Sequence, residues 1–425
     1  MTALVAQSPV LSPKPGITAS INRNVHPKAK ALAILNSSHS PALSVPGPNA
    51  TAASTPGDGG LDLAEQMNKE TREKYVTGDR LGEGTYAVVY SGHFRSDPAR
   101  LVAIKKIKVQ QEWKDGIPMD AIREIKFLQE LEHPNIIKLY DVYSTKDQNI
   151  SLVLEHLPLG DLEGLWKNKE ISYTSADIKS WSNMLAQAIW WCHEHFVLHR
   201  DIKGNNLLIA ADGTVKLADF GLARSFADAG RPMTHVVITR FYRPPELLYG
   251  ARHYSGKVDI WSVGCVIAEL AIRRFFLTGD SDLGQLAVIC EHFGTPTEET
   301  WPGVSKLEYY IKPSEQQSWQ GNGTAPRKGY PSSWWKAAFP LLGDDGIDLL
   351  RAMLTPDPNK RLSAKQVLDH PYWTNAPRPT KKENLPKQGG GEMKMGADLK
   401  RRGGEAESGR ADKVARKLDF GAMKK

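Results

Sequence analysis

Short apolar and β-branched runs, separated by glycine, aspartate and proline, open the patterned part of the chain. Such runs are typical of strands in a small antiparallel sheet. The predicted strands are residues 75–76, 87–90, 101–104, 136–142 and 150–154. Between the third and the fourth, residues 120–131 place Ile122, Ile125 and Leu128 at helical spacing, which predicts an amphipathic helix.

After Asp161 the spacing of apolar residues becomes helical. The predicted helices are residues 178–195, 257–270, 283–293, 346–353 and 364–369. The order of elements therefore predicts an α+β chain in two lobes. A β-rich N-lobe covers about 75–156, and a larger, mainly helical C-lobe covers about 157–373.

The two ends of the chain lack this patterning. Residues 1–60 are rich in Pro, Ser, Ala and Asn, and they hold too little apolar surface to offset the entropy of ordering. We therefore expect a disordered N-terminal tail, followed by a short lead-in at 61–74. Residues 374–425 are rich in Gly, Lys and Glu, which predicts a flexible basic tail.

Charge and composition restrict the possible partners. The formal net charge of +7 would suit a nucleic-acid-binding surface, but it divides into +3 for residues 1–60, −3 for 61–375 and +7 for 376–425. Because the excess lies at the ends, we expect no direct nucleic-acid partner for the patterned body. No apolar run reaches the length of about 18 residues that a membrane span needs, so no membrane partner is expected. The three cysteines lie far apart in apolar runs, which predicts buried, reduced thiols.

A glycine-rich segment, Leu-Gly-Glu-Gly-Thr-Tyr-Ala-Val-Val, occupies residues 81–89. Its glycines would let backbone N–H groups approach phosphates. A dinucleotide-binding fold needs a helix after such a loop, whereas β-branched residues follow here, so we interpret the loop as a hairpin lid over a nucleotide. Lys105, at the end of a predicted strand, is then the cation that orients the phosphates, and Glu124 on the next helix is its ionic partner.

Residues 199–208, His-Arg-Asp-Ile-Lys-Gly-Asn-Asn-Leu-Leu, carry the groups that phosphoryl transfer needs. Asp201 can accept a hydroxyl proton, Lys203 can lie near the transferred group, and Asn206 offers a neutral oxygen to a metal ion. Asp219, followed by Phe-Gly, adds a carboxylate of the kind that Mg²⁺ prefers.

With these motifs in this order, residues 75–373 resemble a eukaryotic protein kinase. Pro244-Pro245-Glu246 stands where the family has Ala-Pro-Glu, residues 259–264 resemble its buried-aspartate helix, and Arg361 falls where the family has the arginine that pairs with this glutamate. The chain departs from the family at Ala87, which replaces the third glycine of the loop, and at Pro244, which replaces alanine.

The resemblance implies a bilobal kinase fold and the use of ATP and Mg²⁺. The implied catalytic residues are Asp201, Lys203, Lys105 and Glu124, and the implied metal ligands are Asn206 and Asp219. Leu154 is implied to guard the back of the adenine pocket, with backbone groups near Glu155 and Leu157 holding the adenine. The implied ATP-binding set is Leu81, Gly82, Glu83, Gly84, Thr85, Tyr86, Ala87, Val89, Ala103, Lys105, Leu154, Glu155, Leu157, Asp161 and Leu208.

Two segments resemble the cyclin-dependent branch of the family. Residues 117–124, Ile-Pro-Met-Asp-Ala-Ile-Arg-Glu, resemble its cyclin-binding helix, and residues 233–243, Met-Thr-His-Val-Val-Ile-Thr-Arg-Phe-Tyr-Arg, resemble its activation segment. The resemblance implies that a cyclin presses the helix inward so that Glu124 reaches Lys105. It also implies that Thr234 is phosphorylated.

The activation segment carries further implied roles. A doubly charged phosphate on Thr234 would gather the regulatory arginines Arg123, Arg200 and Arg224. Thr85 and Tyr86 match a pair that inhibitory kinases modify in cell-cycle members. Arg243 is implied to occupy the carbonyl of Val237, which leaves no acceptor for the amide that follows the target residue. Proline has no N–H, so substrates with Ser-Pro or Thr-Pro are expected.

Within this branch the chain most resembles the CDK-activating kinase of general transcription factor IIH. The resemblance rests on residues 115–126, on the Thr239-Arg240 pair and on tail segments at 399–402 and 416–420. It implies an H-type cyclin and an assembly factor as partners. It implies the C-terminal repeats of RNA polymerase II and the activation loops of other cyclin-dependent kinases as substrates.

Two alternatives remain open, a cell-cycle cyclin-dependent kinase and a kinase-fold scaffold in a transcription or repair complex. The basic residues of 400–417 resemble a bipartite import signal, which predicts a nuclear location. Residues 310–340 look like an insertion with Trp319, Trp334 and Trp335. We interpret it as a packed excursion in preference to a partner-binding loop.

Overall fold

The computed structural model describes residues 63–83, 87–108, 118–145, 149–228, 230–312 and 327–387. The predicted roles of Gly84, Thr85 and Tyr86 lie outside the described residues. So do the predicted N-terminal tail, the predicted import signal and Trp319.

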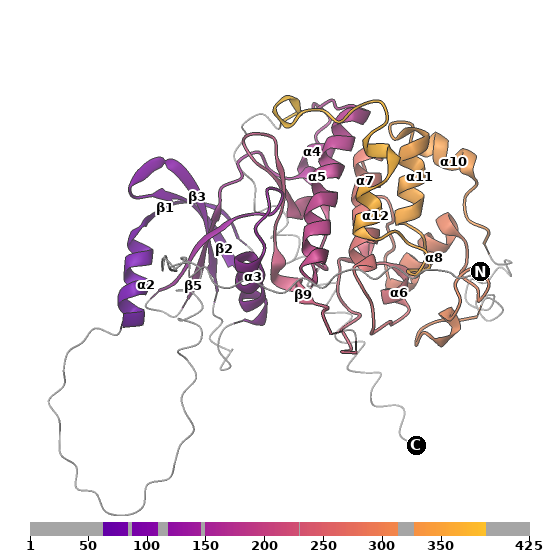
Figure 1. The fold of residues 1–425 in the computed structure, drawn as a ribbon, viewed down its shortest axis with the longest axis horizontal. Helices are drawn as coiled ribbons and strands as arrows, with labels where there is room; N and C mark the ends of the chain where they lie inside the picture. Colours follow the sequence, from indigo (N-terminus) through magenta and orange to yellow (C-terminus); the bar gives the residue numbers. More distant parts are fainter. Residues whose placement is uncertain are drawn as a thin grey trace, which may run out of the picture. The chain divides into compact units, whose positions relative to one another are not determined.

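Antiparallel strands form the N-lobe sheet (Figure 1). The described strands of this sheet are β1 (Tyr75–Glu83), β2 (Ala87–Phe94), β3 (Asp97–Ile107), β4 (Leu139–Ser144) and β5 (Ile150–Glu155), in the order β1-β2-β3-β5-β4. Every predicted strand is present, although most are longer than their apolar runs because cross-strand pairing continues into polar residues. The fourth begins at Leu139, since Ile136 instead forms an isolated parallel bridge with Leu217.

The side chains of strand β3 alternate between the two faces of this sheet. Successive side chains of a strand point to opposite faces. Val102 and Ile104 are buried in a small cluster with Tyr75, Tyr143 and Val153. Ala103 belongs to the main core, on the other face, and Lys105 follows it two positions later on that same face. The alternation therefore directs Lys105 toward the side of the sheet that meets the rest of the molecule.

Two helices accompany the sheet. Helix α2 (Leu63–Glu73) lies in the segment predicted only as a lead-in, and Asn68 anchors it to β4 by donating to the carbonyl of Ser144 (2.9 Å) and accepting from its N–H (2.7 Å). Within the described range 63–83 this helix buries no residue, so it adds no side chain to the core.

Helix α3 (Met119–Glu130) confirms the predicted amphipathic helix but not all of its buried face. Ile125 and Leu128 are buried as the spacing suggests, whereas Ile122 is 36% exposed. Phe127 and Glu124 are buried instead. The helix is rotated so that Glu124 faces the sheet, and this rotation places Ile122 at the surface.

The C-lobe is helical, and each predicted helix is present. Its described α-helices are α4 (Leu162–Lys167), α5 (Ser175–Glu194), α6 (Pro245–Leu248), α7 (Lys257–Ile272), α8 (Asp282–Phe293), α10 (Ser332–Ala338), α11 (Gly343–Met353) and α12 (Ala364–Leu368). Helix α5 begins at a capping box formed by Thr174 and Asp177. Helix α7 contacts both α5 and α11 and is buried along nearly its whole length. All three cysteines are buried and free, as predicted.

The described part of the predicted insertion, residues 310–312 and 327–340, is packed at its C-terminal end. Trp335 and Phe339 are buried, and their rings stack at 5.6 Å. Phe276 packs edge-on against Phe339 at 5.5 Å. These contacts support a packed excursion for this part of the segment.

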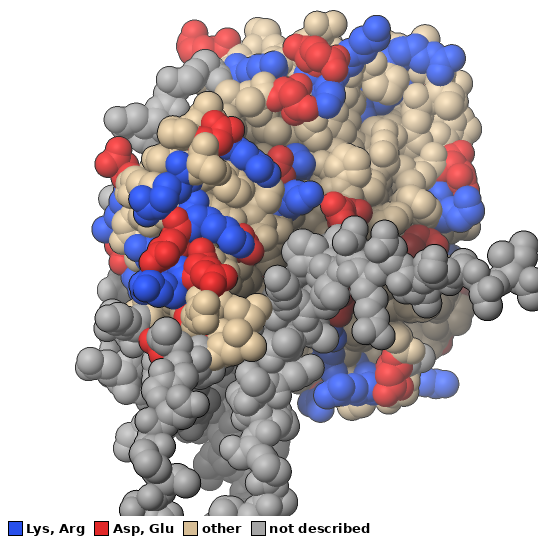
Figure 2. Space-filling model, turned by 60° about the vertical axis from the view of Figure 1, so that its left-hand side comes forward, with Lys and Arg blue, Asp and Glu red and all other residues tan. Residues whose placement is uncertain are grey.

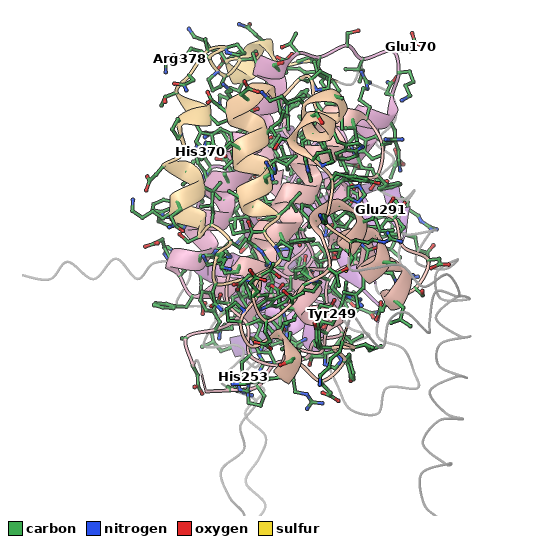
Figure 3. The ribbon with its side chains drawn as sticks, turned by 90° about the vertical axis from the view of Figure 1, so that its right-hand side faces the viewer. Glu170, Tyr249, His253, Glu291, His370 and Arg378 are labelled. Carbon is green, nitrogen blue, oxygen red and sulfur yellow. The ribbon has the colours of Figure 1, made fainter. Side chains whose placement is uncertain are left out.

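The predicted flexible tail begins too early. The buried side chain of Lys179 donates to the carbonyls of Asn375 (3.0 Å) and Pro377 (2.8 Å), and Leu385 is itself buried. Lys382 pairs with Asp212 at 2.6 Å. Figure 3 shows Arg378 at one end of the helical lobe, opposite the end that carries His253. A few tethers therefore hold residues 374–387 on the body, although the composition of this segment is polar.

The surface of the described residues mixes charges of both signs. Figure 2 shows Lys and Arg interspersed with Asp and Glu on the face turned toward the viewer. This distribution agrees with the near balance counted for the patterned body. Among the described helices, none combines the length and the apolar character that crossing a membrane requires.

Candidate active site

Two short β-ribbons frame the predicted catalytic loop. Strand β6 (Val197–Leu198) pairs with β9 (Arg224–Ser225), and β7 (Leu207–Ile209) pairs with β8 (Val215–Leu217). The first ribbon leads into the loop that carries Asp201, and the second leads into the segment that carries Asp219. Asp201 and Asp219 therefore each follow a short strand. The two ribbons bring together segments that lie almost 20 positions apart in the sequence.

Asp201 lies at the centre of this loop and is 2% exposed. Lys203 Nζ lies 3.1 Å from its Oδ2, and Asn206 Nδ2 donates to the same oxygen at 3.1 Å. Thr239 Oγ1 donates to Oδ1 at 2.9 Å. The structure thus brings Asp201, Lys203 and Asn206 together, as predicted. Thr239 was noted in the sequence only as a subfamily marker, and its contact with Asp201 is made by tertiary folding.

Asp259 on α7 binds the backbone of the predicted catalytic loop. Its Oδ1 accepts from the N–H of Arg200 (3.0 Å), and its Oδ2 accepts from the N–H of His199 (3.0 Å) and lies 2.9 Å from His193 Nε2. Burial by itself would raise the pKa of Asp259. The hydrogen bonds from His193 and from the Arg200 backbone outweigh burial and hold the pKa below its ordinary value. A charged carboxylate therefore fixes two consecutive N–H groups immediately before Asp201.

Lys105 and Glu124 form the predicted ion pair. Lys105 Nζ lies 2.8 Å from Oε1 and 2.6 Å from Oε2 of Glu124, and 3.9 Å from Oδ1 of Asp219. Burial raises the pKa of Glu124, and the lysine opposes that shift. The resemblance implied that a cyclin brings this pair together, whereas the structure of the single chain already contains it.

The apolar members of the predicted ATP-binding set share one part of the main core. The buried members are Ala87, Val89, Ala103, Leu154, Leu157 and Leu208, and Leu81 packs against them. Ala103 pairs with Leu154 across β3 and β5, and Leu208 forms a bridge with Asp161. The two strands and the β7 segment therefore present small and aliphatic side chains around one region, as an adenine site requires.

The polar members of that set have other partners. Glu155 pairs with Lys216 at 2.9 Å, and Asp161 caps α4 by accepting from the Gly164 N–H at 2.7 Å. Glu83 pairs with Lys108. These carboxylates therefore contribute to the frame of the site through contacts that the sequence did not indicate.

The metal-binding prediction depends on Asn206 and Asp219. The N–H of Ala218 donates to the carbonyl of Asn206 at 2.9 Å, which ties the residue before Asp219 to Asn206. Asn206 donates its amide nitrogen to the carbonyl and to Oδ2 of Asp201, and its amide oxygen is the atom that would bind a metal ion. Among the described residues, no group of three or more His, Cys, Asp and Glu side chains forms a metal cage. One carboxylate and one amide oxygen nevertheless fit Mg²⁺, which completes its shell with phosphate and water oxygens.

Thr234 is exposed, and its backbone is joined to the catalytic loop through Tyr254. The hydroxyl of Tyr254 donates to the Thr234 carbonyl at 2.7 Å and accepts from Arg200 Nη1 at 3.1 Å. Burial and the guanidinium groups of Arg200, Arg231 and Arg123 lower the pKa of Arg224. Two of the predicted arginines, Arg200 and Arg123, therefore lie close enough to Arg224 to repel its charge.

Two members of this cluster were missed from the sequence. Arg231 precedes Thr234 by three positions in a loop, and that proximity was the available signal. Tyr254 is 20 positions away from Thr234, and only the fold places its hydroxyl there.

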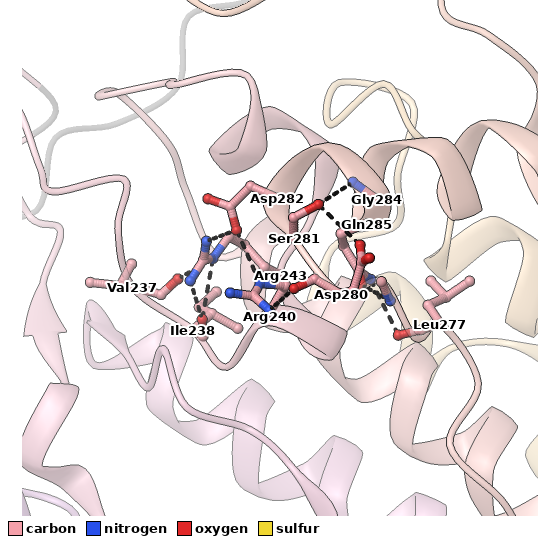
Figure 4. Close-up of polar contacts among 11 residues, drawn as sticks. Val237, Ile238, Arg240, Arg243, Leu277, Asp280, Ser281, Asp282, Gly284 and Gln285 are labelled. Atoms are coloured by element: carbon pink, nitrogen blue, oxygen red, sulfur yellow. Dashed lines mark hydrogen bonds and ion pairs between the residues drawn. The ribbon is translucent and has the colours of Figure 1, made fainter. Parts of the chain in front are cut away.

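Arg243 contacts the backbone of the activation segment. Its Nε donates to the carbonyl of Val237 at 2.9 Å, as the resemblance implied, and its Nη2 donates to the carbonyl of Ile238 at 3.0 Å (Figure 4). Its Nη1 lies 3.0 Å from Oδ1 of Asp282. The carboxylate of Asp282 was not predicted.

The contacts described above define the class of protein to which the chain belongs. The sequence model of the protein kinase domain family matches residues 75–373, and the chain belongs to this family. The pairing of Glu246 with Arg361 at 2.6 and 2.8 Å, predicted from the same resemblance, is also present.

Individual relatives indicate the branch of the family more specifically than the family model does. The chain is 46% identical over 317 residues to cyclin-dependent kinase 7 of Xenopus laevis (74% of this chain, 85% of that protein). It is 44% identical over 313 residues to the serine/threonine-protein kinase KIN28 of Saccharomyces cerevisiae (72% and 95%). A solved structure of the CAK complex from Chaetomium thermophilum bound to ATP-gamma-S matches with a TM-score of 0.73 and 57% identity, covering 77% of this chain and 99% of that chain.

The chain is thus an ATP-dependent serine/threonine protein kinase of the cyclin-dependent branch, and it is similar to cyclin-dependent kinase 7 and to a chain of the CAK complex.

Proposed function

We propose that this kinase phosphorylates serine or threonine followed by proline, in the C-terminal repeats of RNA polymerase II, in the activation loops of other cyclin-dependent kinases, or in both. The observation that carries the proposal is the hydrogen bond from Arg243 Nε to the Val237 carbonyl. With this acceptor occupied, an amide N–H after the target residue would lose its partner, at a cost of about 1–3 kcal/mol. Proline avoids that cost because it has no N–H.

The geometry supports a division of roles around Asp201. Its carboxylate accepts the proton of the substrate hydroxyl. The hydrogen bond that it accepts from the hydroxyl of Thr239 supports this role, because a substrate hydroxyl would donate to the carboxylate in the same way. Lys203, 3.1 Å from Asp201, stabilises the transferred group. Lys105, held by Glu124, orients the ATP phosphates.

Asn206 and Asp219 would hold Mg²⁺, which supplies neutralisation of the phosphate charge when bound. The backbone link between Ala218 and Asn206 keeps these two ligands adjacent. The buried carboxylate of Asp259 maintains the loop in the orientation that this arrangement needs.

An H-type cyclin with an assembly factor is the proposed partner, and the nucleus is the proposed location. Helix α3 supports a docking role because Met119 is 56% exposed and Ile122 is 36% exposed on its outer side. A bound cyclin would cover these side chains and stabilise the inward position of Glu124.

The test uses the full chain purified from its host with its bound partners. Phosphorylation of a Tyr-Ser-Pro-Thr-Ser-Pro-Ser repeat is compared with that of a kinase activation-loop peptide, and each peptide has a matched version with Ala in place of the critical Pro. We expect transfer to at least one Pro-containing peptide and little to the Ala versions. Equal rates on the Pro and Ala versions would contradict proline direction, and activity on neither peptide would contradict the proposed substrates.

The scaffold alternative is tested in the same host. Asp201→Asn removes the proposed base while changing little in volume. Full restoration of every cellular function by Asp201→Asn would favour a scaffold, whereas loss of function with normal partner binding favours catalysis.

A further inference from the structure

The guanidinium group of Arg243 has two kinds of partner. One edge faces the backbone, where Nε and Nη2 donate to the carbonyls of Val237 and Ile238 at 2.9 and 3.0 Å. The remaining terminal nitrogen, Nη1, lies 3.0 Å from Oδ1 of Asp282. Because the Arg243 side chain is only 12% exposed, few water molecules compete for its contacts with the two carbonyls, whereas the Asp282 side chain, at 52% exposed, also faces water.

The backbone that Arg243 contacts is in an unfavourable conformation. Ile238 has a φ of 69°, in the left-handed region that a β-branched residue rarely adopts. A conformation of this kind persists only when surrounding contacts impose it. The hydrogen bonds from Arg243 to the Val237 and Ile238 carbonyls are contacts that stabilise this conformation.

Asp282 is itself held in place by the start of α8. The preceding Ser281 caps this helix by accepting from the Gly284 N–H at 3.0 Å. The buried side chain of Gln285 accepts from the Gly279 N–H at 2.8 Å and donates to the Leu277 carbonyl at 3.3 Å. The turn that carries Asp282 is thus supported from both sides (Figure 4).

A second arginine shares the same carboxylate oxygen. Arg240 Nε lies 3.3 Å from Asp282 Oδ1, and Arg240 Nη1 donates to the carbonyl of Asp280 at 2.8 Å. Arg240 and Arg243 are both cationic and lie three positions apart, so one carboxylate between them offsets their repulsion. Without that negative charge, each arginine would keep only its hydrogen bonds to backbone carbonyls, and the repulsion between the two guanidinium groups would no longer be offset.

We propose that Asp282 is a positioning residue for substrate choice: it orients Arg243 on the Val237 carbonyl and thereby sets the preference for proline after the target residue. This inference rests on the proposed proline-directed function. Asp282 is not among the residues assigned to ATP, Mg²⁺ or phosphoryl transfer, and its effect on substrate choice passes through Arg243.

The experiment measures kcat/KM of the full chain with its bound partners on three peptides that differ after the target serine: proline, alanine and N-methylalanine. N-methylalanine lacks the N–H, like proline, but has no ring. Damage to the catalytic centre would lower all three rates together. Loosening of Arg243 would instead change the ratio of proline to alanine, because it frees the Val237 carbonyl to accept the alanine N–H.

Asp282→Asn and Asp282→Ala are the test variants, and Asp282→Glu is the conservative variant. We expect the proline-to-alanine ratio to fall about fivefold in Asp282→Asn and further in Asp282→Ala, which removes the acceptor as well as the charge. N-methylalanine should follow proline in each variant. Asp282→Glu should retain most of the ratio.

Asp280→Asn is the matched control. It makes the same change in charge two positions away, and the contact of Asp280 with Arg240 uses the backbone carbonyl, which this substitution leaves in place. Its ratio should stay within about twofold of the wild-type value.

The outcomes separate the two proposals. If the wild-type chain shows no preference for proline, the proposed function fails. If the wild-type chain prefers proline and folded Asp282→Asn and Asp282→Ala keep the same ratio, the role of Asp282 is overturned while the proposed function stands. An equal fall in Asp280→Asn would also overturn it, since a general effect of charge would then explain the result.

Discussion

Arg361 donates through Nη1 and Nη2 to the two carboxylate oxygens of Glu246, at 2.6 and 2.8 Å, across 115 positions of the sequence. The arginine side chain is 0% exposed and the glutamate side chain 4%. Arg361 also donates to the carbonyl of Thr355 at 2.9 Å. The pair therefore joins α6, directly after the activation segment, to the chain that follows α11.

Removing one member of this ion pair should lower the free energy of unfolding. Glu246→Ala leaves a buried guanidinium group without its counter-ion, so we expect the free energy of unfolding to fall by about 3–5 kcal/mol. Denaturant unfolding measures the change. Glu291→Ala is the matched control, because Glu291 pairs with Arg327 at the surface and its loss should cost less than about 1 kcal/mol. Similar losses in the two variants would contradict the structural importance of the buried pair.

Lys105→Met should lower kcat/KM by about 10²–10³-fold, because it removes the cation, paired with Glu124, that is proposed to orient the ATP phosphates. The matched control is Lys106→Met. The neighbouring lysine lies on the opposite face of β3, with its ammonium group 4.5 Å from the centre of the Tyr90 ring. Steady-state kinetics with a protein substrate distinguish the two variants. A loss in Lys106→Met as large as that in Lys105→Met would contradict the assignment.

Phosphorylation of Thr234 should raise Tm by roughly 2–5 °C, since it replaces repulsion among clustered arginines with up to about three charge-assisted hydrogen bonds. The lowered pKa of Arg224 reflects burial and that repulsion. Thermal unfolding of the phosphorylated and unphosphorylated chains measures the gain, which should shrink as salt concentration rises.

Thr234→Ala, carried through the same phosphorylation reaction, is the control and should show no gain. Arg231→Gln should reduce the gain, because Arg231 belongs to the same cluster. An unchanged Tm on phosphorylation at low salt would contradict the proposed role of the cluster.

Glu269 should make stability depend on pH. This residue is 1% exposed, and its Oε2 accepts from the Tyr242 hydroxyl at 2.9 Å. Burial raises the pKa of Glu269 to about 8, so the folded chain holds a proton that the unfolded chain releases near pH 4.5. The free energy of unfolding should therefore fall as pH rises from about 5 to 8, by up to about 1.4 kcal/mol per pH unit from this group.

Glu269→Gln keeps a hydrogen-bond acceptor for Tyr242 and removes the titration. Its free energy of unfolding should decline less than that of the wild-type chain over the same range, so the variant gains relative stability at pH 8. Denaturant unfolding at pH 5, 6.5 and 8 measures the two slopes. Equal slopes would show that Glu269 does not control this dependence.

Much of the site could be predicted because its chemistry is local in sequence. Asp201, Lys203 and Asn206 lie within six positions of one another, and a phosphoryl-transfer site needs a base, a cation and a metal-binding oxygen close together. The Lys105–Glu124 pair was also predictable, because a lysine inserted in a cleft needs an ionic partner and the next helix supplies one.

Other contacts had no local signal. Tyr254 reaches Thr234 only because the loop before α7 folds back on the activation segment. Asp282 lies 39 positions from Arg243, at the start of a helix whose apolar pattern gives no reason to connect the two residues. Helix α2 and the packed segment at 374–387 were missed because a few long-range hydrogen bonds, rather than apolar periodicity, hold them.

The sequence by itself determined the order of strands and helices, the family and the residue types of the phosphoryl-transfer site. Periodicity and motif spacing depend on neighbours along the chain, and both can be read from it directly. The tertiary structure alone decided which face of α3 is buried, that residues 374–387 pack on the body, and which carboxylate contacts the arginine beside Val237. These depend on the direction in which distant side chains point, and the direction is set when the lobes pack.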